Sequence, residues 1–251
     1  MARKKNLTRE DLEDVSTYET QTYNIQSNGS NNIRLQDIKL EVKCLNEKQK
    51  KLRRSIEDKD VVISTGPAGT GRTYMSLLTA LHLMKTQPKY RRLVLVKSLQ
   101  VIKGEELGFL PGNLWDKMEP YMFSFTGNLD KIFHNPAITK GLIDKGVIEI
   151  FPITYIRGVT MDNCIVIVDE AQNLSMHTFR TIITRIGRNC KMVFLGDTEQ
   201  VDLRDKNTSC LSRVAELFED QEYAGSVVFE DEDSVRNPII PELLKLLKGE
   251  E

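Results

Sequence analysis

The chain has 251 residues, enough for one or two domains with a complete hydrophobic core. Its 35 basic and 36 acidic residues do not indicate a nucleic-acid-binding protein, so any such surface must be local. No run of about 18 apolar residues occurs, which excludes a membrane-spanning helix. The cysteines are scattered and predict buried thiols of a reducing cytoplasm rather than disulfides or a metal site: Cys44, Cys164, Cys190 and Cys210.

Residues 1–43 are predicted to form a polar N-terminal arm. The stretch TYETQTYNIQSNGSNNIRLQ within it is rich in Asn, Ser, Gln and Thr and shows no hydrophobic periodicity. Such composition is typical of flexible or loosely docked segments. From residue 44 the pattern becomes that of a globular protein, so we expect one folded domain over residues 44–251.

Short apolar runs recur through this domain and predict the strands of one sheet. They are rich in β-branched residues and apolar at successive positions, as strands buried on both faces are. Helical segments separate several of them, and this alternation predicts an α/β fold with a mostly parallel sheet and helices on both faces. The runs are VVIS (61–64), LVLV (93–96), VIEIF (147–151), IVIV (165–168), MVFL (192–195) and VVF (227–229).

The segment after the first predicted strand is similar to a phosphate-binding loop. The pattern G-x-x-x-x-G-K-[ST] fits Gly66 to Thr73 except at Arg72, where lysine is expected. Glycines let backbone N–H groups point at a phosphate, and the helix that follows adds its positive dipole end. A nucleotide site in which Thr73 holds Mg²⁺ is therefore predicted, with an inert glycine-rich turn as the alternative. The predicted contacts are Gly66, Pro67, Ala68, Gly69, Thr70, Gly71, Arg72 and Thr73.

Two further motifs follow later predicted strands. In CIVIVDEAQN, Asp169 and Glu170 form a Walker B pair, in which the first carboxylate holds the magnesium shell and the second activates the attacking water. In VFLGDTEQVDL, Gln200 is placed to hydrogen-bond the terminal phosphate or the water. Three strand-end motifs in this order predict nucleotide hydrolysis, with three unrelated loops as the alternative.

With these motifs, the chain resembles the PhoH-like proteins, a phosphate-starvation-inducible ATPase family, over residues 44–247. The resemblance implies a RecA-like P-loop domain similar to the first motor domain of superfamily 1 helicases. It also implies ATP as substrate, Mg²⁺ as cofactor, and remodelling of RNA or single-stranded nucleic acid. The segments that carry it are GPAGTGRTY (66–74), GEELGFLPGNLWDKMEPY (104–121), PITYIRGVTMDNCIVIVDEAQN (152–173), ITRIG (183–187), GDTEQVDL (196–203) and DSVRNP (233–238).

The same resemblance assigns roles to residues beside the motifs. Gln49 takes the place of the glutamine that reads the adenine edge in superfamily 1 helicases, with a surface glutamine as the alternative. Tyr74 lies near the base or seats the helix, and we expect packing. Lys97 and Lys103 follow the second strand, where related motors touch the nucleic-acid backbone; solvated loop lysines are the alternative.

Only one motor domain fits this chain, whereas helicases have two and the second supplies an arginine that stabilises the transferring phosphate. We therefore expect a homo-oligomer, a hexameric ring with a site at each interface. The candidate arginines are Arg185 in ITRIG and Arg236 in DSVRNP, with Arg157 in YIRG as a weaker candidate. Structural ion pairing is the alternative for each of the three.

Arg72 departs from the family pattern at the residue that contacts the β- and γ-phosphates. Arginine keeps the positive charge, so nucleotide binding is expected to survive, but its bulkier planar fork places a donor less well for catalysis. Two interpretations follow: a natural variant with slow turnover, or an exchange that traps a bound state. Two functions follow as well, an ATPase motor on nucleic acid and a nucleotide-dependent assembly module with little or no hydrolysis.

Overall fold

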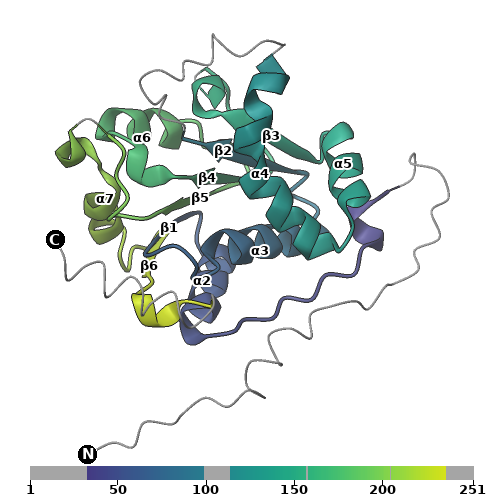
Figure 1. Ribbon diagram of the computed structural model, residues 1–251, viewed down its shortest axis with the longest axis horizontal. Coiled ribbons are helices and arrows are strands. Elements are labelled where there is room, and N and C mark those ends of the chain that lie inside the picture. The colour runs from purple at the N-terminus through teal and green to yellow at the C-terminus, as the bar shows by residue number, and fades with distance from the viewer. Residues whose placement is uncertain (1–32, 99–113, 157, 204, 236–251) are drawn as a thin grey trace, which may run out of the picture. The chain divides into compact units, whose positions relative to one another are not determined.

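The computed structural model describes residues 33–98, 114–156, 158–203 and 205–235 (Figure 1). The predicted arm up to residue 32 lies outside the described residues. Three candidate site residues also lie outside them: Lys103, Arg157 and Arg236.

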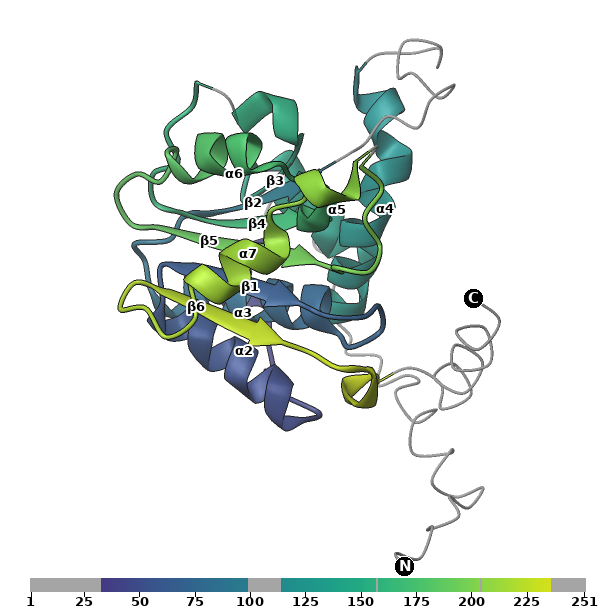
Figure 2. The same cartoon turned by 90° about the vertical axis from the view of Figure 1, so that its left-hand side faces the viewer.

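A six-stranded, all-parallel sheet lies at the centre of the domain, in the order β3-β2-β4-β5-β1-β6 (Figures 1 and 2). Each strand contains or overlaps one of the predicted apolar runs, and the predicted α/β fold is confirmed. The strands are β1 (Val61–Thr65), β2 (Arg92–Lys97), β3 (Ile148–Pro152), β4 (Cys164–Asp169), β5 (Cys190–Gly196) and β6 (Ala224–Val228).

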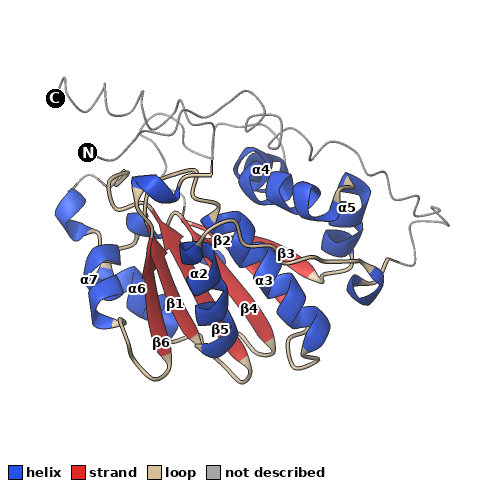
Figure 3. Cartoon of the chain, turned by 90° about the horizontal axis from the view of Figure 1, so that it is seen from below, coloured by secondary structure: helices blue, strands red, loops and turns tan. Residues whose placement is uncertain are grey.

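Helices cover both faces of this sheet (Figure 3). The α-helices are α2 (Glu47–Asp58), α3 (Arg72–Thr86), α4 (Leu114–Phe133), α5 (Pro136–Asp144), α6 (Met176–Ile183) and α7 (Leu211–Leu217). Short 3₁₀ helices are η1 (Leu35–Asp37), η3 (Ile153–Ile156), η4 (Ala171–Asn173), η5 (Lys206–Thr208) and η6 (Asp231–Asp233). None of the helices in the described part of the chain combines the length and apolarity needed to cross a membrane.

Each strand supplies side chains to two separate cores. On β1, Val62 packs with the helices α2 to α5, whereas its neighbours Val61 and Ile63 pack with α6 and α7. The same alternation places Leu93 of β2 in the first core and Val94 in the second. Because both faces are covered, successive strand residues must be apolar, which explains the continuous apolar runs in the sequence.

Residues 33–43 pack on this domain, although their polar pattern assigned them to the arm. Leu35 and Ile38 are buried against the core that contains α3, and the Ile38 carbonyl accepts from Lys85 Nζ. The Ile33 carbonyl accepts from Lys145 Nζ at 2.7 Å. The compact unit therefore begins at Ile33 rather than at residue 44, because a few well-placed apolar side chains anchor an otherwise polar stretch.

The strand order brings four strand ends together. In a parallel sheet all carboxyl ends lie at one edge, and β2, β4, β5 and β1 are consecutive neighbours in it. Ligands of open α/β sheets bind at this edge. The three predicted motifs follow β1, β4 and β5, so the fold gathers them at one place.

Candidate functional site

The loop between β1 and α3 requires glycine at two positions. Gly66 has a φ of +139°, and a Cβ there would lie 2.5 Å from the Phe229 carbonyl oxygen. Gly71 has a φ of +77°, and a Cβ there would lie 2.8 Å from Gln49 Nε2. From the described residues, no acceptor binds the backbone N–H of Gly69 or Gly71. These groups and the N-terminus of α3 supply the donors and the dipole that favour a phosphate.

The side chain of Gln49, from α2, packs against this loop. Its side chain is buried, its Nε2 donates to the Thr70 carbonyl at 3.0 Å, and its Oε1 accepts from the Leu45 N–H at 2.8 Å. The alternative of a surface glutamine is therefore wrong. Contact with an adenine edge stays a prediction, and the structure gives Gln49 a further role, which is to support the loop backbone.

Arg72 uses its guanidinium to join the loop to β5. Its Nη1 donates to the Gly196 carbonyl and its Nη2 donates to the Pro67 carbonyl at 3.2 Å. Burial lowers the pKa of the Arg72 guanidinium, while the carboxylates of Asp197, Asp169 and Glu170 oppose that shift. At least two donors of the fork are thus bound to backbone oxygens.

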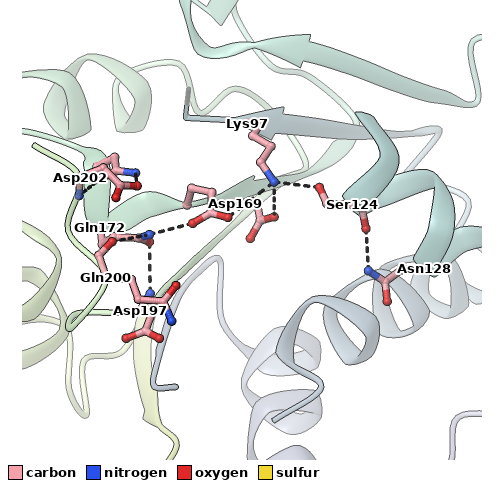
Figure 4. Close-up of polar contacts among 10 residues, drawn as sticks. Lys97, Ser124, Asn128, Asp169, Gln172, Asp197, Gln200 and Asp202 are labelled. Carbon is pink, nitrogen blue, oxygen red and sulfur yellow. Dashed lines mark hydrogen bonds and ion pairs between the residues drawn. The ribbon is translucent and has the colours of Figure 1, made fainter. Parts of the chain in front are cut away.

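The Walker B pair lies at the carboxyl end of β4, which ends at Asp169, and a lysine from β2 faces the pair. Lys97 Nζ lies 3.6 Å from Asp169 Oδ2 and 3.6 Å from Glu170 Oε1 (Figure 4). Burial raises the pKa of Asp169, and the charge of Lys97 counteracts this. Glu170 has a φ of +56°, a backbone angle that residues other than glycine rarely adopt and that often marks a functional position.

Gln172 connects the Walker B pair to the segment after β5. Its Nε2 donates to Glu170 Oε2 at 2.7 Å and to the Gln200 carbonyl at 3.1 Å (Figure 4). Its Oε1 accepts from the Asp197 N–H at 3.1 Å. One buried carboxamide thus fixes the catalytic glutamate candidate relative to the GDTEQ loop, while the Gln200 side chain is exposed.

A second pair reinforces the same connection. Asn173 Nδ2 donates to Asp202 Oδ2 at 3.1 Å, and Asn173 Oδ1 accepts from the Asp202 N–H at 2.9 Å (Figure 4). Neither Gln172 nor Asn173 was predicted as a site residue, although both are letters of the DEAQN motif. The sequence feature that could have identified them is this pair of amide side chains, which follows the two carboxylates after one alanine.

The donor set suits a nucleotide-bound magnesium ion better than a stand-alone metal site. No cluster of three His, Cys, Asp or Glu side chains that could hold a metal occurs among the described residues. Mg²⁺ prefers one or two carboxylates together with substrate phosphates and waters. The Asp169 carboxylate and the Thr73 hydroxyl have the right chemistry for that role, and the loop before α3 offers N–H donors for phosphate.

Other predicted residues take different places. Tyr74 is half-buried against the core beneath α3, in agreement with the expected packing. Lys97 is not a solvated loop lysine, since its side chain is 15% exposed and its ammonium faces the Walker B pair. A contact of Lys97 with a nucleic-acid backbone stays a prediction.

Arg185 lies at the opposite edge of the sheet. Its carbonyl accepts from the Met161 N–H, just before β4 begins, so the length of β4 separates it from Asp169, about 20 Å. Among the described residues Arg185 forms no ion pair; its Nη2 donates to Thr184 Oγ1 at 3.1 Å. It cannot complete the site of its own chain.

Comparison with known proteins gives matches over most of the chain. The family model described as PhoH-like protein matches residues 41–248. A PhoH-like protein of Bacillus subtilis is 34% identical over 186 residues, which are 74% of this chain and 57% of that protein. Protein PhoH of Escherichia coli is 35% identical over 195 residues, which are 77% of this chain and 54% of that protein. The chain thus spans little more than half the length of these curated relatives.

Solved structures also match this chain, at low sequence identity. The large terminase from a thermophilic bacteriophage has a TM-score of 0.48 and 12% identity, covering 81% of this chain and 50% of that chain. The Hef helicase domain of Pyrococcus furiosus has a TM-score of 0.41 and 12% identity, covering 72% of this chain and 37% of that chain.

Proposed function

Since the chain belongs to the PhoH-like protein family, we propose that it binds and hydrolyses ATP and couples hydrolysis to remodelling of RNA or single-stranded nucleic acid. The observation that carries the ATPase part is the meeting of three motifs at adjacent strand ends. These motifs are the loop after β1, the Asp169–Glu170 pair at the end of β4 and the GDTEQ segment at the end of β5, and the three strands are neighbours in the sheet. Gln172 joins the second motif to the third by hydrogen bonds.

Each residue then has a definite role. The loop N–H groups and the start of α3 bind phosphate, and Arg72 adds positive charge. Thr73 and Asp169 would hold Mg²⁺, which when bound neutralises phosphate charge. Glu170 accepts a proton from the attacking water, and Gln172 keeps that carboxylate oriented. Gln200, on the segment that Gln172 also holds, is placed to respond to the terminal phosphate.

Replacement of Glu170 tests the hydrolytic role. In an Arg72→Lys background, Glu170→Gln should abolish phosphate release and keep ATP binding, because the carboxamide keeps the shape but cannot accept the proton. The control is Glu149→Gln, which removes a carboxylate of β3 that pairs with Arg92 at 2.9 Å, away from the site. Turnover of Glu170→Gln within a few-fold of its parent would contradict the assignment.

A nucleotide-dependent assembly module is the second candidate, and Arg72 favours it. With two donors on backbone carbonyls, the guanidinium is held within the loop. Phosphate release by the unmodified chain, with and without RNA, separates the two functions. Nucleotide binding without turnover under both conditions supports the module, whereas RNA-stimulated turnover supports the motor.

The assembly part of the proposal is a homo-oligomeric ring, a hexamer. Its support is the position of Arg185, which lies a strand length from the site of its own chain and forms no ion pair with the described residues. A head-to-tail interface would bring the amino edge of one sheet to the carboxyl edge of the next, and such an interface forms a ring when the rotation between neighbours closes.

A further inference from the structure

Lys97 has an environment that its strand position does not explain. Its side chain is 15% exposed at the end of β2, and its ammonium lies between Asp169 and Glu170, 3.6 Å from an oxygen of each. The side chain of Asp169 is equally inaccessible, at 13% exposure. One buried cation therefore serves two adjacent carboxylates, of which the proposed function assigns the first to a divalent cation.

The contacts of this ammonium are of unequal strength. The two carboxylate distances exceed the 2.7–2.9 Å typical of a charge-assisted hydrogen bond. The close contact is with a neutral group, since Nζ donates to Ser124 Oγ of α4 at 2.9 Å (Figure 4). The Phe125 ring lies beneath it, with its centroid 6.0 Å from Nζ. The lysine thus supplies charge to the acidic pair without a tight bond to either acid.

We propose that Lys97 is the resident counter-cation of the Asp169–Glu170 pair and exchanges with the divalent metal. In metal-free protein its ammonium partly offsets the charge of the buried Asp169 and the more exposed Glu170, and it repels a second cation. Metal alone then binds weakly, and the phosphates of a nucleotide are needed to bring it in. A compact ammonium on a flexible stem is suited to leave such a place, which a bidentate arginine is not.

The exchange links the nucleotide site to α4. The same ammonium donates to Ser124 of α4, so its displacement from the acidic pair would reach α4 through this contact. The inference rests on the metal role that the proposed function gives to Asp169.

Metal binding without nucleotide tests the proposal. Lys97→Met keeps the length of the side chain and removes its charge. In nucleotide-free protein, this change should lower the unfolding midpoint and tighten the Mn²⁺ dissociation constant at least about tenfold, because a positive charge next to the metal is lost. Added Mn²⁺ should restore the midpoint of Lys97→Met. Both quantities are measured, the affinity by electron paramagnetic resonance and the midpoint by calorimetry.

Lys191→Met is the matched control. Lys191 is also buried, at 4% exposure, but lies at the amino end of β5, where its Nζ donates to the Lys59 carbonyl at 2.6 Å. This variant should lose stability that Mn²⁺ does not restore, with an unchanged Mn²⁺ affinity. Lys97→Arg, which keeps the charge, should stay weak in metal binding. If Lys97→Met does not fold, Lys97→Gln should show the same gain in affinity.

Three results would overturn the inference. Equal Mn²⁺ affinities of Lys97→Met and the unmodified chain would contradict the inference and leave the proposed function intact, because the metal site would then exist without competition from Lys97. Weaker binding by Lys97→Met would make the lysine a support of the metal site instead. Absence of Mn²⁺ binding in every protein, even with ADP, would remove the metal site of the proposed function as well.

Discussion

At the scale of single residues, Arg72 keeps the positive charge of the expected lysine but places its hydrogen-bond donors differently. Its charge is preserved, and its fork is bound to the carbonyls of Gly196 and Pro67. Ground-state affinity depends on loop N–H groups and net charge, whereas the transition state needs a donor aimed at developing negative charge. We therefore expect position 72 to affect nucleotide binding and turnover differently.

Arg72→Lys should raise kcat by about 10²–10³, because one preorganised donor is worth that much in the transition state. The ATP dissociation constant should tighten only about tenfold, or about 1.4 kcal/mol. Steady-state phosphate release and equilibrium titration of both proteins measure the two effects. Turnover of a few per second by the unmodified chain, or no nucleotide binding at all, would show that charge and placement do not separate in this way.

Among the side chains that the structure describes, Phe123 of α4 is the exposed aromatic best placed for a nucleobase. It is 65% exposed and adjoins Ser124, which reaches Lys97 at the carboxyl edge of the sheet. Stacking of a base on an aromatic ring contributes about 1–3 kcal/mol. Phe123→Ala should therefore weaken single-stranded RNA binding about tenfold in a fluorescence titration.

Tyr223→Ala is the control for that measurement. Tyr223 is 67% exposed, but its carbonyl accepts from the Val61 N–H at 3.1 Å, which places it at the amino edge. Its loss should leave RNA affinity unchanged. Equal effects of the two substitutions would mean that neither edge is preferred.

At the scale of elements, the strands were predictable and several contacts between them were not. Burial on both faces forces continuous apolar runs, so each strand was visible in the sequence. The three motifs lie at neighbouring strand ends, because parallel strands end at one edge. The orientation of Lys97 was not predictable, since it depends on β2 pairing with β4, from residues far apart in the chain. The burial of Gln49 likewise follows from α2 packing behind a loop it does not adjoin in sequence.

The close contact between Gly66 of the phosphate-binding loop and Phe229, the residue after β6, gives a prediction at the scale of elements. Gly66→Ala should destabilise the domain by about 2–3 kcal/mol, because a Cβ would overlap the Phe229 backbone at 2.5 Å and the φ of +139° disfavours a side chain. Urea denaturation measures this change. The control, Gly127→Ala in α4, meets no atom within 4 Å and should stabilise by about 0.5–1 kcal/mol. Similar changes in the free energy of unfolding for both variants would show that the contact between Gly66 and Phe229 is not tightly packed.

At the scale of the whole molecule, the separation of Arg185 from its own site predicts complementation between chains. In an Arg72→Lys background, Glu170→Gln and Arg185→Ala chains should each be inactive alone. Mixed, they should recover part of the activity, since some interfaces pair an intact site with an intact arginine. Phosphate release across mixing ratios measures this. Sedimentation that finds only monomers at micromolar concentration with ATP and Mg²⁺ would exclude the ring.

The position of β1 has a consequence for the order in which the parts of this protein can fold. β1 comes first along the chain, yet its two neighbours in the sheet are the last strands made: Val61 aligns with Met192 of β5 and with Ala224 of β6. Synthesis and folding proceed from the N-terminus, and such distant pairings form slowly. During translation β1 must wait for nearly the whole domain. The nucleotide site is thus the last part to mature, and a ribosome-bound chain that ends before β5 should retain no ATP.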